Sequence, residues 1–304
     1  MTAWLARHAR TLLAVSLLTG IVLPDLAATL KPWLPLGVAG LLWGAMVRLD
    51  WSAVRLHLGR PGVLAAGLGW MMLVGPFAAW AVARGLGLSD GLTAGLILMA
   101  CAPPVMSAPA IALMIGLDAP LILLLVVLGT FAAPLSAPLL LEVLTDLDLS
   151  LSATSVALRL GLLVGGCALA ALLARRIMGR GGLQRAEPGL EVFSLGCMVL
   201  FAIAVMDGVA AALQADPGRV VVLIAGAFAA ALGMLALSAA VFARLGWPVA
   251  LTIGYAAGNR NMALMMAALP TTGLDDVWLW FAMVQFPIYT LPMILGRPIR
   301  AMLP

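Results

Sequence analysis

Charged residues are scarce in this chain of 304 amino acids, and their scarcity excludes an ordinary soluble domain. Asp, Glu, Lys and Arg together make up 10% of the sequence. Hydrophobic residues make up 64%, against about 45–50% in typical globular proteins. The mean hydropathy is +1.13. We therefore classify the chain as an all-α polytopic membrane protein that lies in a lipid bilayer.

Residues that carry chemistry are also scarce. The two histidines, His8 and His57, fall at the predicted membrane edge. The three cysteines, Cys101, Cys167 and Cys197, lie in apolar stretches without the spacing of metal ligands or of a secreted disulfide framework. The sequence contains no nucleophile–base constellation, no phosphate-binding loop and no basic-aromatic groove. It predicts neither an enzyme nor a nucleic-acid-binding protein, and no metal site.

Ten apolar runs set the predicted number of membrane spans, because a helix needs about 20 residues to cross a bilayer. In chain order these runs cover residues 11–30, 33–47, 61–83, 90–115, 119–141, 152–174, 190–213, 220–243, 247–270 and 277–296. Run one is expected to span rather than to act as a signal peptide, since no small-x-small cleavage site follows it. The polar stretch Leu49 to Arg60 is expected to lie as a short helix in the membrane interface. Residues 1–304 then form a single transmembrane domain.

Basic residues predict the orientation, because Lys and Arg collect in cytoplasmic loops. With ten spans and an internal N-terminus, twelve of the seventeen basic residues fall on the cytoplasmic side. They are Arg7, Arg10, Arg48, Arg55, Arg60, Arg175, Arg176, Arg180, Arg185, Arg244, Arg297 and Arg300. We expect a protein of the cytoplasmic (inner) membrane with both termini in the cytoplasm. The net charge of +4 reflects this orientation and gives no reason to infer nucleic-acid binding.

Five spans in each half force the second half to enter the membrane from the opposite side. Residues 1–150 and 151–304 are therefore predicted to be two inverted repeats. Runs four and nine, which correspond in the two halves, are both interrupted by polar or helix-breaking residues. An unpaired backbone group costs several kcal/mol in lipid, so such breaks are tolerated only where protein or a water-filled cavity surrounds them. Matching breaks in two halves indicate the substrate site of a transporter.

In run four the break is rich in proline. Pro103, Pro104 and Pro109 remove backbone donors and disfavour helix in the residues that precede them. We expect unwinding between about Cys101 and Pro109. The half-helix that follows would present a positive N-terminal end, and run nine would present another, a pair suited to an anion. Ser107 adds a hydroxyl at the same level.

In run nine the break contains two asparagines and a glycine. The backbone is expected to open near Gly254 or Gly258, where Asn259 and Asn261 can hydrogen-bond to the released groups. We expect these two asparagines to tie the breaks of runs four and nine together.

Arg260, between the two asparagines, lies about 20 Å into the run and therefore near the middle of the bilayer core. A guanidinium at that depth costs at least about 2.5–3.5 kcal/mol on insertion scales, so it must face a cavity, a partner or both. Three interpretations remain open. Arg260 binds an anionic substrate, it pairs permanently with Asp207, the one acidic residue that we place inside a span, or it has some other arrangement.

The chain resembles the bile acid:sodium symporter family over nearly its whole length. The resemblance rests on the ten spans, the interfacial segment that ends in Arg60-Pro61, the Cys-Pro-rich break, Pro134 and Pro138 in run five, and the Gly-x-x-Asn pattern from Gly258 to Asn261. It implies two inverted five-helix repeats in which runs four and nine cross. It also implies that runs one, two, six and seven form a panel against which a core of the other six runs moves.

The sequence departs from this family where the family's sodium-dependent members bind the ion. Those members typically have a glutamate two residues before the glycine of the run-nine pattern and a glutamine two residues after it, where this chain has Ala256 and Arg260. They also have Ser-Asn where this chain has Ala108 and Pro109. A carboxylate and at least two neutral oxygen ligands are thus missing, and a guanidinium beside the site would repel sodium.

We therefore predict a secondary transporter of a small organic anion that works without the usual sodium site and needs no cofactor. The predicted substrate-binding residues are Arg260, Asn259, Asn261, Gly258, Ser107, Pro103, Pro104, Pro109 and Asp207. Three alternatives remain open. They are a sodium-coupled symporter of the same family, an arsenite-type efflux carrier that depends on Cys101, and a non-transporting scaffold or sensor.

Overall fold

The computed structural model describes residues 2–49, 61–145 and 152–303, and these residues are helical apart from turns and short unwound segments. The first half contains α1 (Thr2–Val22), α2 (Pro24–Leu30), η1 (Lys31–Trp33), α3 (Leu34–Arg48), α5 (Pro61–Gly69), the π-helical turn η2 (Trp70–Val74), α6 (Gly75–Gly85), α7 (Asp90–Cys101), α8 (Ala108–Ile115) and α9 (Ala119–Leu144). The second half contains α10 (Ala153–Ala204), α11 (Val209–Ala215), α12 (Pro217–Phe242), η3 (Ala243–Leu245), α13 (Trp247–Gly258), α14 (Met262–Met266) and α15 (Asp275–Met302).

Seven helical segments among the described residues are long and apolar enough to cross a membrane. They are Pro24–Arg48, Pro61–Gly85, Ala119–Leu144, Ala153–Gly179, Gly181–Ala215, Pro217–Leu245 and Asp275–Met302. Run one is divided between α1 and α2, and runs four and nine are each divided into two shorter helices. The predicted interfacial helix at residues 49–60 lies almost wholly outside the described residues.

The first predicted run extends too far along the chain. It was expected to reach residue 30, but α1 ends at Val22 and a new helix starts at Pro24. Proline disfavours helical geometry in the residue before it, and Leu23 has φ −116° and ψ 72°. Residues 24–30 consequently belong with the second span.

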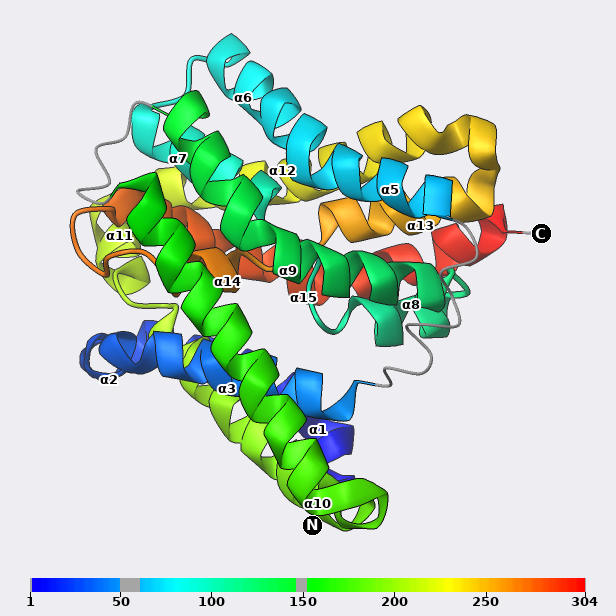
Figure 1. Ribbon diagram of the computed structural model, residues 1–304. Helices are drawn as coiled ribbons and strands as arrows, with labels where there is room; N and C mark the ends of the chain where they lie inside the picture. Colours follow the sequence, from blue (N-terminus) through cyan, green and yellow to red (C-terminus); the bar gives the residue numbers. More distant parts are fainter. Residues whose placement is uncertain (1, 50–60, 146–151, 304) are drawn as a thin grey trace.

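The basic segment between runs six and seven is a sharp turn, so α10 consists of two helices joined at Gly179. Gly179 has φ 62° and ψ −179°, a conformation that is essentially restricted to glycine. The two arms of α10 therefore run back along each other as a hairpin (Figure 1).

The helices form two groups. In Figure 1, α1, α2, α3 and α10 lie together in the lower part of the molecule, and α3 and α1 pack directly on α10. The remaining helices form the upper group, in which α12 packs on α13 and α15, and α7 packs on α6 and α15.

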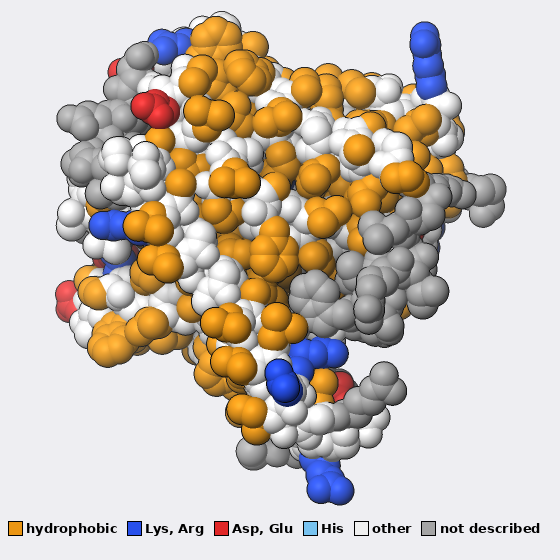
Figure 2. Space-filling model, viewed as in Figure 1, with side chains coloured by type: hydrophobic (Ala, Val, Ile, Leu, Met, Phe, Trp, Pro, Cys, Tyr) orange, Lys and Arg blue, Asp and Glu red, His pale blue; other side chains and the backbone are white. Residues whose placement is uncertain are grey.

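The outer surface is apolar, as expected for a protein whose helices face lipid. Figure 2 shows hydrophobic side chains over most of one face, with the basic side chains at its periphery. Leu135 in α9 is 79% exposed and Val222 in α12 is 69% exposed, although both helices are apolar. A soluble protein rarely exposes so continuous an apolar surface, whereas acyl chains can cover it in a bilayer.

Candidate functional site at the helix crossing

Run four is broken where the sequence predicted. α7 ends at Cys101 and α8 begins at Ala108, so residues 102–107 are not helical. The prolines within and just after this segment explain the break, since neither Pro103 nor Pro104 can donate a helical hydrogen bond.

Run nine is broken at the second of the two predicted places. α13 continues through Gly254 to Gly258, and only Asn259 to Asn261 separate it from α14. A break near Gly258 is therefore confirmed, and the alternative of a break near Gly254 is wrong. The second half-helix is also short, because α14 has only five residues.

The two glycines of α13 serve close packing instead. A Cβ atom at Gly254 would lie 2.7 Å from the carbonyl oxygen of Leu235, and one at Gly258 would lie 2.6 Å from that of Ala231. Both carbonyls belong to α12, so these glycines let the two helix backbones approach each other, as small residues do in membrane helix pairs.

The unwound segments of runs four and nine cross and pair with each other. The backbone N–H of Val105 donates to the carbonyl oxygen of Asn259 over 2.9 Å, and that of Asn261 donates to the carbonyl oxygen of Pro103 over 2.7 Å. The residues between these pairs form an isolated antiparallel bridge. Each break therefore satisfies backbone groups that the other leaves open, which explains how both are tolerated within a membrane protein.

The two asparagines contribute to this crossing through their main chains. The side chain of Asn259 is buried, and its Nδ2 donates to the carbonyl oxygen of Tyr255 within the same helix end. Asn261 is half-buried and lines a cavity beside the crossing. The two residues thus connect the breaks as expected, but the connecting hydrogen bonds do not come from their side chains.

Arg260 is the largest fully buried side chain described, with 1% of its surface exposed. Its guanidinium donates to three carbonyl oxygens. Nε bonds to Ala257 over 2.8 Å, Nη1 to Ala102 over 2.8 Å, and Nη2 to Met71 over 3.3 Å. These acceptors lie at the end of α13, just after the end of α7, and in the π-helical turn η2.

The helix ends around Arg260 explain how its charge is accommodated. A helix C-terminus carries about half a negative charge, and α7 and α13 both end beside the guanidinium. Two such ends together oppose about one positive charge. The buried cation is therefore balanced by backbone dipoles, and no carboxylate among the described residues forms an ion pair with it.

Asp207 lies elsewhere, so the alternative of a permanent Arg260–Asp207 pair is wrong. Its Oδ2 forms an ion pair of 2.9 Å with Nζ of Lys31, which also lies 5.0 Å from the ring centroid of Trp278. Asp207 follows the end of α10, at a turn made possible by the positive φ of Gly208, and this turn brings it to η1 rather than to the crossing.

A cavity of about 470 Å³ lies beside the crossing, between α3 and α10 on one side and α14 and α15 on the other. Three predicted site residues line it, namely Ser107, Arg260 and Asn261. Pro103, Pro104, Pro109, Gly258, Asn259 and Asp207 are not among its lining residues. The first five belong to the crossing or its flanks.

Several polar residues of this cavity are not among those predicted from the sequence. They are Arg48, Glu191, Ser194, Gln285 and Tyr289. Gln285 could have been noticed as an isolated amide within run ten. Arg48 and Glu191 resemble the ordinary charges that flank membrane spans, so only the packing of α3 against α10 shows that both line one cavity.

A second cavity, of about 370 Å³, reaches Arg260 from the opposite side. It lies between α6, α7 and α12 and is lined mainly by apolar residues, with Trp70, Ser238 and Arg260 among its few polar groups. The crossing and its arginine therefore separate two hollows of the protein.

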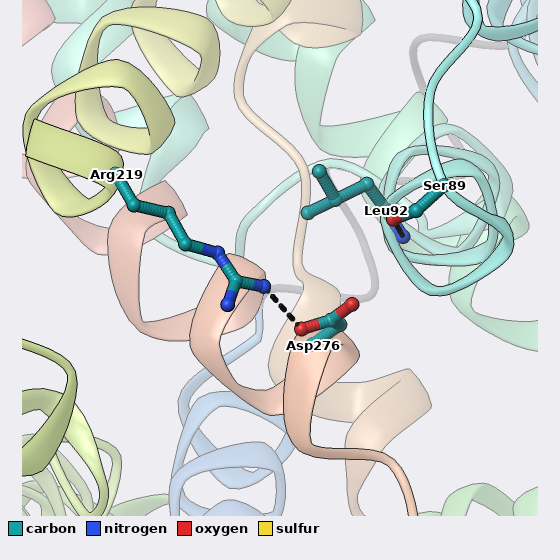
Figure 3. A network of polar contacts seen from close by, with 4 residues as sticks. All are labelled: Ser89, Leu92, Arg219 and Asp276. Atoms are coloured by element: carbon teal, nitrogen blue, oxygen red, sulfur yellow. Dashed lines mark hydrogen bonds and ion pairs between the residues drawn. The ribbon is translucent and has the colours of Figure 1, made fainter. Parts of the chain in front are cut away.

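Polar contacts at one edge of the upper helix group hold the ends of its helices. In Figure 3, Arg219 at the start of α12 reaches Asp276 at the start of α15, and Ser89 caps α7 by accepting from the backbone N–H of Leu92. Both members of the ion pair are exposed, and such pairs contribute little to stability.

Residues 35–217 match a family model described as the Sodium Bile acid symporter family. The match covers more than half of the chain, from α3 through the run-four break to the start of α12. The chain belongs to the sodium bile acid symporter family. As a member, it is a membrane transporter, and the transporters of this family are not enzymes. The match ends before run nine, so the departures at Ala256 and Arg260 lie beyond it. No curated protein matches the chain.

Proposed function

We propose that this protein is a secondary transporter of a small organic anion, and that it works without the sodium site of its relatives. The observation that carries the proposal is the position of Arg260. Its guanidinium lies at the crossing and holds three carbonyl oxygens at the interrupted ends of two helices and at η2. Carbonyl oxygens of this kind are also the ligands that a hard cation prefers.

The residues at the crossing do not fit a sodium ion. Ala256, which is fully buried, and Pro109 offer no side-chain oxygen. A sodium ion about 4 Å from the guanidinium would be repelled by about 4 kcal/mol at an effective dielectric constant of 20. We therefore infer that Arg260 is a permanent, covalently attached cation in place of the ion.

An anion fits the adjacent cavity better than a cation does. Ser107 at the start of α8 and the half-buried Asn261 offer hydrogen bonds from the crossing side. The N-terminal end of α8 adds a partial positive charge, whereas the single turn of α14 contributes little. Arg260 acts on the substrate mainly through the shape and charge of the crossing, because each of its three guanidinium nitrogens already donates to a backbone carbonyl.

The wider architecture is part of the same proposal. Residues 1–150 and 151–304 form two inverted repeats, which together cross the membrane ten times. The protein lies in the inner membrane with both termini in the cytoplasm. In support, each half contains one broken helix, followed by a long apolar helix with internal prolines, α9 and α15. The helix group of α1, α3 and α10 serves as the panel against which the other helices move.

An arsenite-type carrier is the less favoured function. Cys101 would have to reach the transported metalloid, but its side chain is fully buried and lines neither of the two large cavities. If a Cys101→Ala strain loses metalloid resistance, this second function regains support.

Uptake measurements test the proposal. The purified protein is reconstituted into liposomes, and uptake of labelled carboxylates is compared in matched sodium and potassium buffers, with empty liposomes as the control. We expect equal uptake in both buffers. A requirement for sodium would refute the role of Arg260, and a lack of uptake above empty liposomes would favour the scaffold. In the double variant Ala256→Glu with Arg260→Gln we expect a partial sodium response.

A further inference from the structure

The cavity beside the crossing contains two basic residues, and they differ in availability. Arg260 is buried, and each of its guanidinium nitrogens already bonds to a carbonyl oxygen. Arg48 is exposed and lines the cavity from the end of α3. Of the two, Arg48 has the side chain that is more open to a ligand, although Arg260 also lines the cavity.

Two hydrogen bonds hold Arg48 against the α3–α10 wall. Its Nε donates to the carbonyl oxygen of Gly44 over 3.0 Å, and its Nη2 donates to Oγ of Ser194 on α10 over 3.0 Å. Within the described part of the chain, Nη1 of Arg48 makes no hydrogen bond. The guanidinium is thus oriented by two partners, with one nitrogen left to bind an acid group.

Helix capping alone does not explain Arg48. A basic side chain often stabilises the last carbonyls of a helix, but a basic residue of another helix, Arg175 of α10, already does so at the end of α3. Nη1 of Arg175 donates to the carbonyl oxygens of Val47 and Leu49, over 2.5 and 2.8 Å. The end of α3 is therefore satisfied without the free nitrogen of Arg48.

Both helices of this wall change from polar to apolar along the cavity. On α3 the lining residues are Val38, Leu41, Leu42, Ala45 and Arg48, which share one helical face. On α10 they are Glu191, Val192, Ser194, Leu195, Met198 and Phe201. Ten residues separate the ends of each series, or about 15 Å along a helix. The charged ends of the two series adjoin each other, because Arg48 bonds to Ser194.

We propose that Arg48 is the residue that recognises the acid group of the transported anion, and that the ligand is an amphipathic monoacid. Its carboxylate bonds to Nη1 of Arg48, and its apolar body lies along Leu41, Met198 and Phe201 towards the crossing. This assignment rests on the proposed function, since it names the substrate class and the recognition residue of the same cavity.

Glu191 gives the proposal a second, opposite consequence. It lines the same end of the cavity, and no ion pair joins it to Arg48 among the described residues. A carboxylate at this place repels an incoming acid, so removal of its charge should strengthen anion binding. Neutralising Arg48 and neutralising Glu191 should therefore act in opposite directions.

The test uses a cysteine inside the cavity and needs no knowledge of the natural substrate. Met198→Cys is made in a Cys197→Ala background of the full chain in lipid nanodiscs, because Cys101 and Cys167 are buried. We compare its rates of modification by anionic sulfonatoethyl methanethiosulfonate and by neutral methyl methanethiosulfonate. The ratio of these two rates cancels differences in accessibility and thiol reactivity.

We expect Arg48→Gln to lower the ratio about tenfold, Arg48→Lys to retain it, and Glu191→Gln to raise it. Arg297→Gln, an exposed α15 position outside the cavity lining, is the matched control and should change nothing. If the Arg48→Gln protein cannot be produced, Glu191→Gln still tests the proposal, because it removes a negative charge from the same end of the cavity and should raise the ratio. An unchanged ratio in Arg48→Gln or Glu191→Gln would overturn the proposal.

Binding of octanoate then tests recognition itself. Octanoate should protect the thiol introduced by Met198→Cys from the neutral reagent, and Arg48→Gln should weaken this protection about 10- to 100-fold, as expected for loss of a charge-assisted hydrogen bond. Protection by octanamide should change little in Arg48→Gln. Equal loss of protection by octanoate and by octanamide, or no protection by octanoate in the first place, would refute the monoacid site. If transport persists unchanged in Arg48→Gln, the role of Arg48 in recognition is refuted, while the proposed function remains intact.

Discussion

Single residues decide the chemistry of the crossing, and Arg260 is the most consequential of them. A guanidinium has five N–H donors in a fixed plane, so one side chain can hold carbonyls from three segments of chain. A lysine offers a compact charge on a flexible stem and cannot reproduce this fork. The arginine is therefore both a charge and a cross-link between α13, the end of α7 and η2.

Replacement of Arg260 should accordingly destabilise the fold. We expect Arg260→Gln to lower the free energy of unfolding by about 2–4 kcal/mol, since it leaves buried carbonyls without their charged donor. Arg260→Lys should cost less than Arg260→Gln but should not restore the wild-type value. Thermal unfolding in detergent measures both, with Arg297→Gln as the control. An unchanged melting temperature in Arg260→Gln would show that its three hydrogen bonds contribute nothing net.

The two asparagines should differ on substitution. Asn261→Ala keeps the backbone N–H that bonds to Pro103 and removes a side chain that lines the cavity, so transport should fall more than expression. Asn259→Ala removes a buried hydrogen bond to Tyr255 and should lower the melting temperature instead. Uptake and expression level are measured for both variants. Equal loss of both quantities in Asn261→Ala would indicate a structural role.

At the scale of elements, the contact between α12 and α13 determines where the run-nine break lies. Because Gly254 and Gly258 are needed for close packing, α13 stays helical through both and opens only at the next residue. The sequence contained the glycines, but a glycine in a membrane helix is equally compatible with a break and with a close contact.

Gly258→Ala tests this packing. The added Cβ would lie 2.6 Å from the carbonyl oxygen of Ala231, so the helices must separate. We expect a loss of about 1–3 kcal/mol in stability, as for other overpacked cores. Gly165→Ala is the matched control, because a Cβ there meets no atom within 4 Å and should stabilise the helix by about 0.5–1 kcal/mol. Equal effects at the two positions would contradict the packing role.

At the scale of the whole molecule, charge placement predicts how the protein sits in the membrane. Reporter fusions after Glu142 and after Gly182 should score outside and inside the cell, respectively, because ten spans with internal termini place these two sites on opposite faces. Gly182 lies just beyond the turn at Gly179, in the basic segment of the α10 hairpin. The opposite result at either site would refute the predicted orientation.

Composition and local pattern were enough to determine the membrane class, the all-helical fold and the break in run four. These features depend on properties of neighbouring residues, namely hydrophobic length and the missing N–H groups of proline. The family resemblance that followed from them is confirmed by the family match over residues 35–217. Local pattern also predicted the division of run nine, although it did not distinguish a break near Gly254 from the observed one after Gly258.

The partners of the charged residues were decided only by the tertiary structure. Arg260 bonds to carbonyls from residues 71, 102 and 257, and Asp207 pairs with Lys31, which is far away in sequence. A charge in a low-dielectric interior takes whichever partner the packing brings within a few ångströms, and backbone carbonyls carry no signature in the sequence. For the same reason, Arg48 looked like an ordinary flanking charge until α3 and α10 came together.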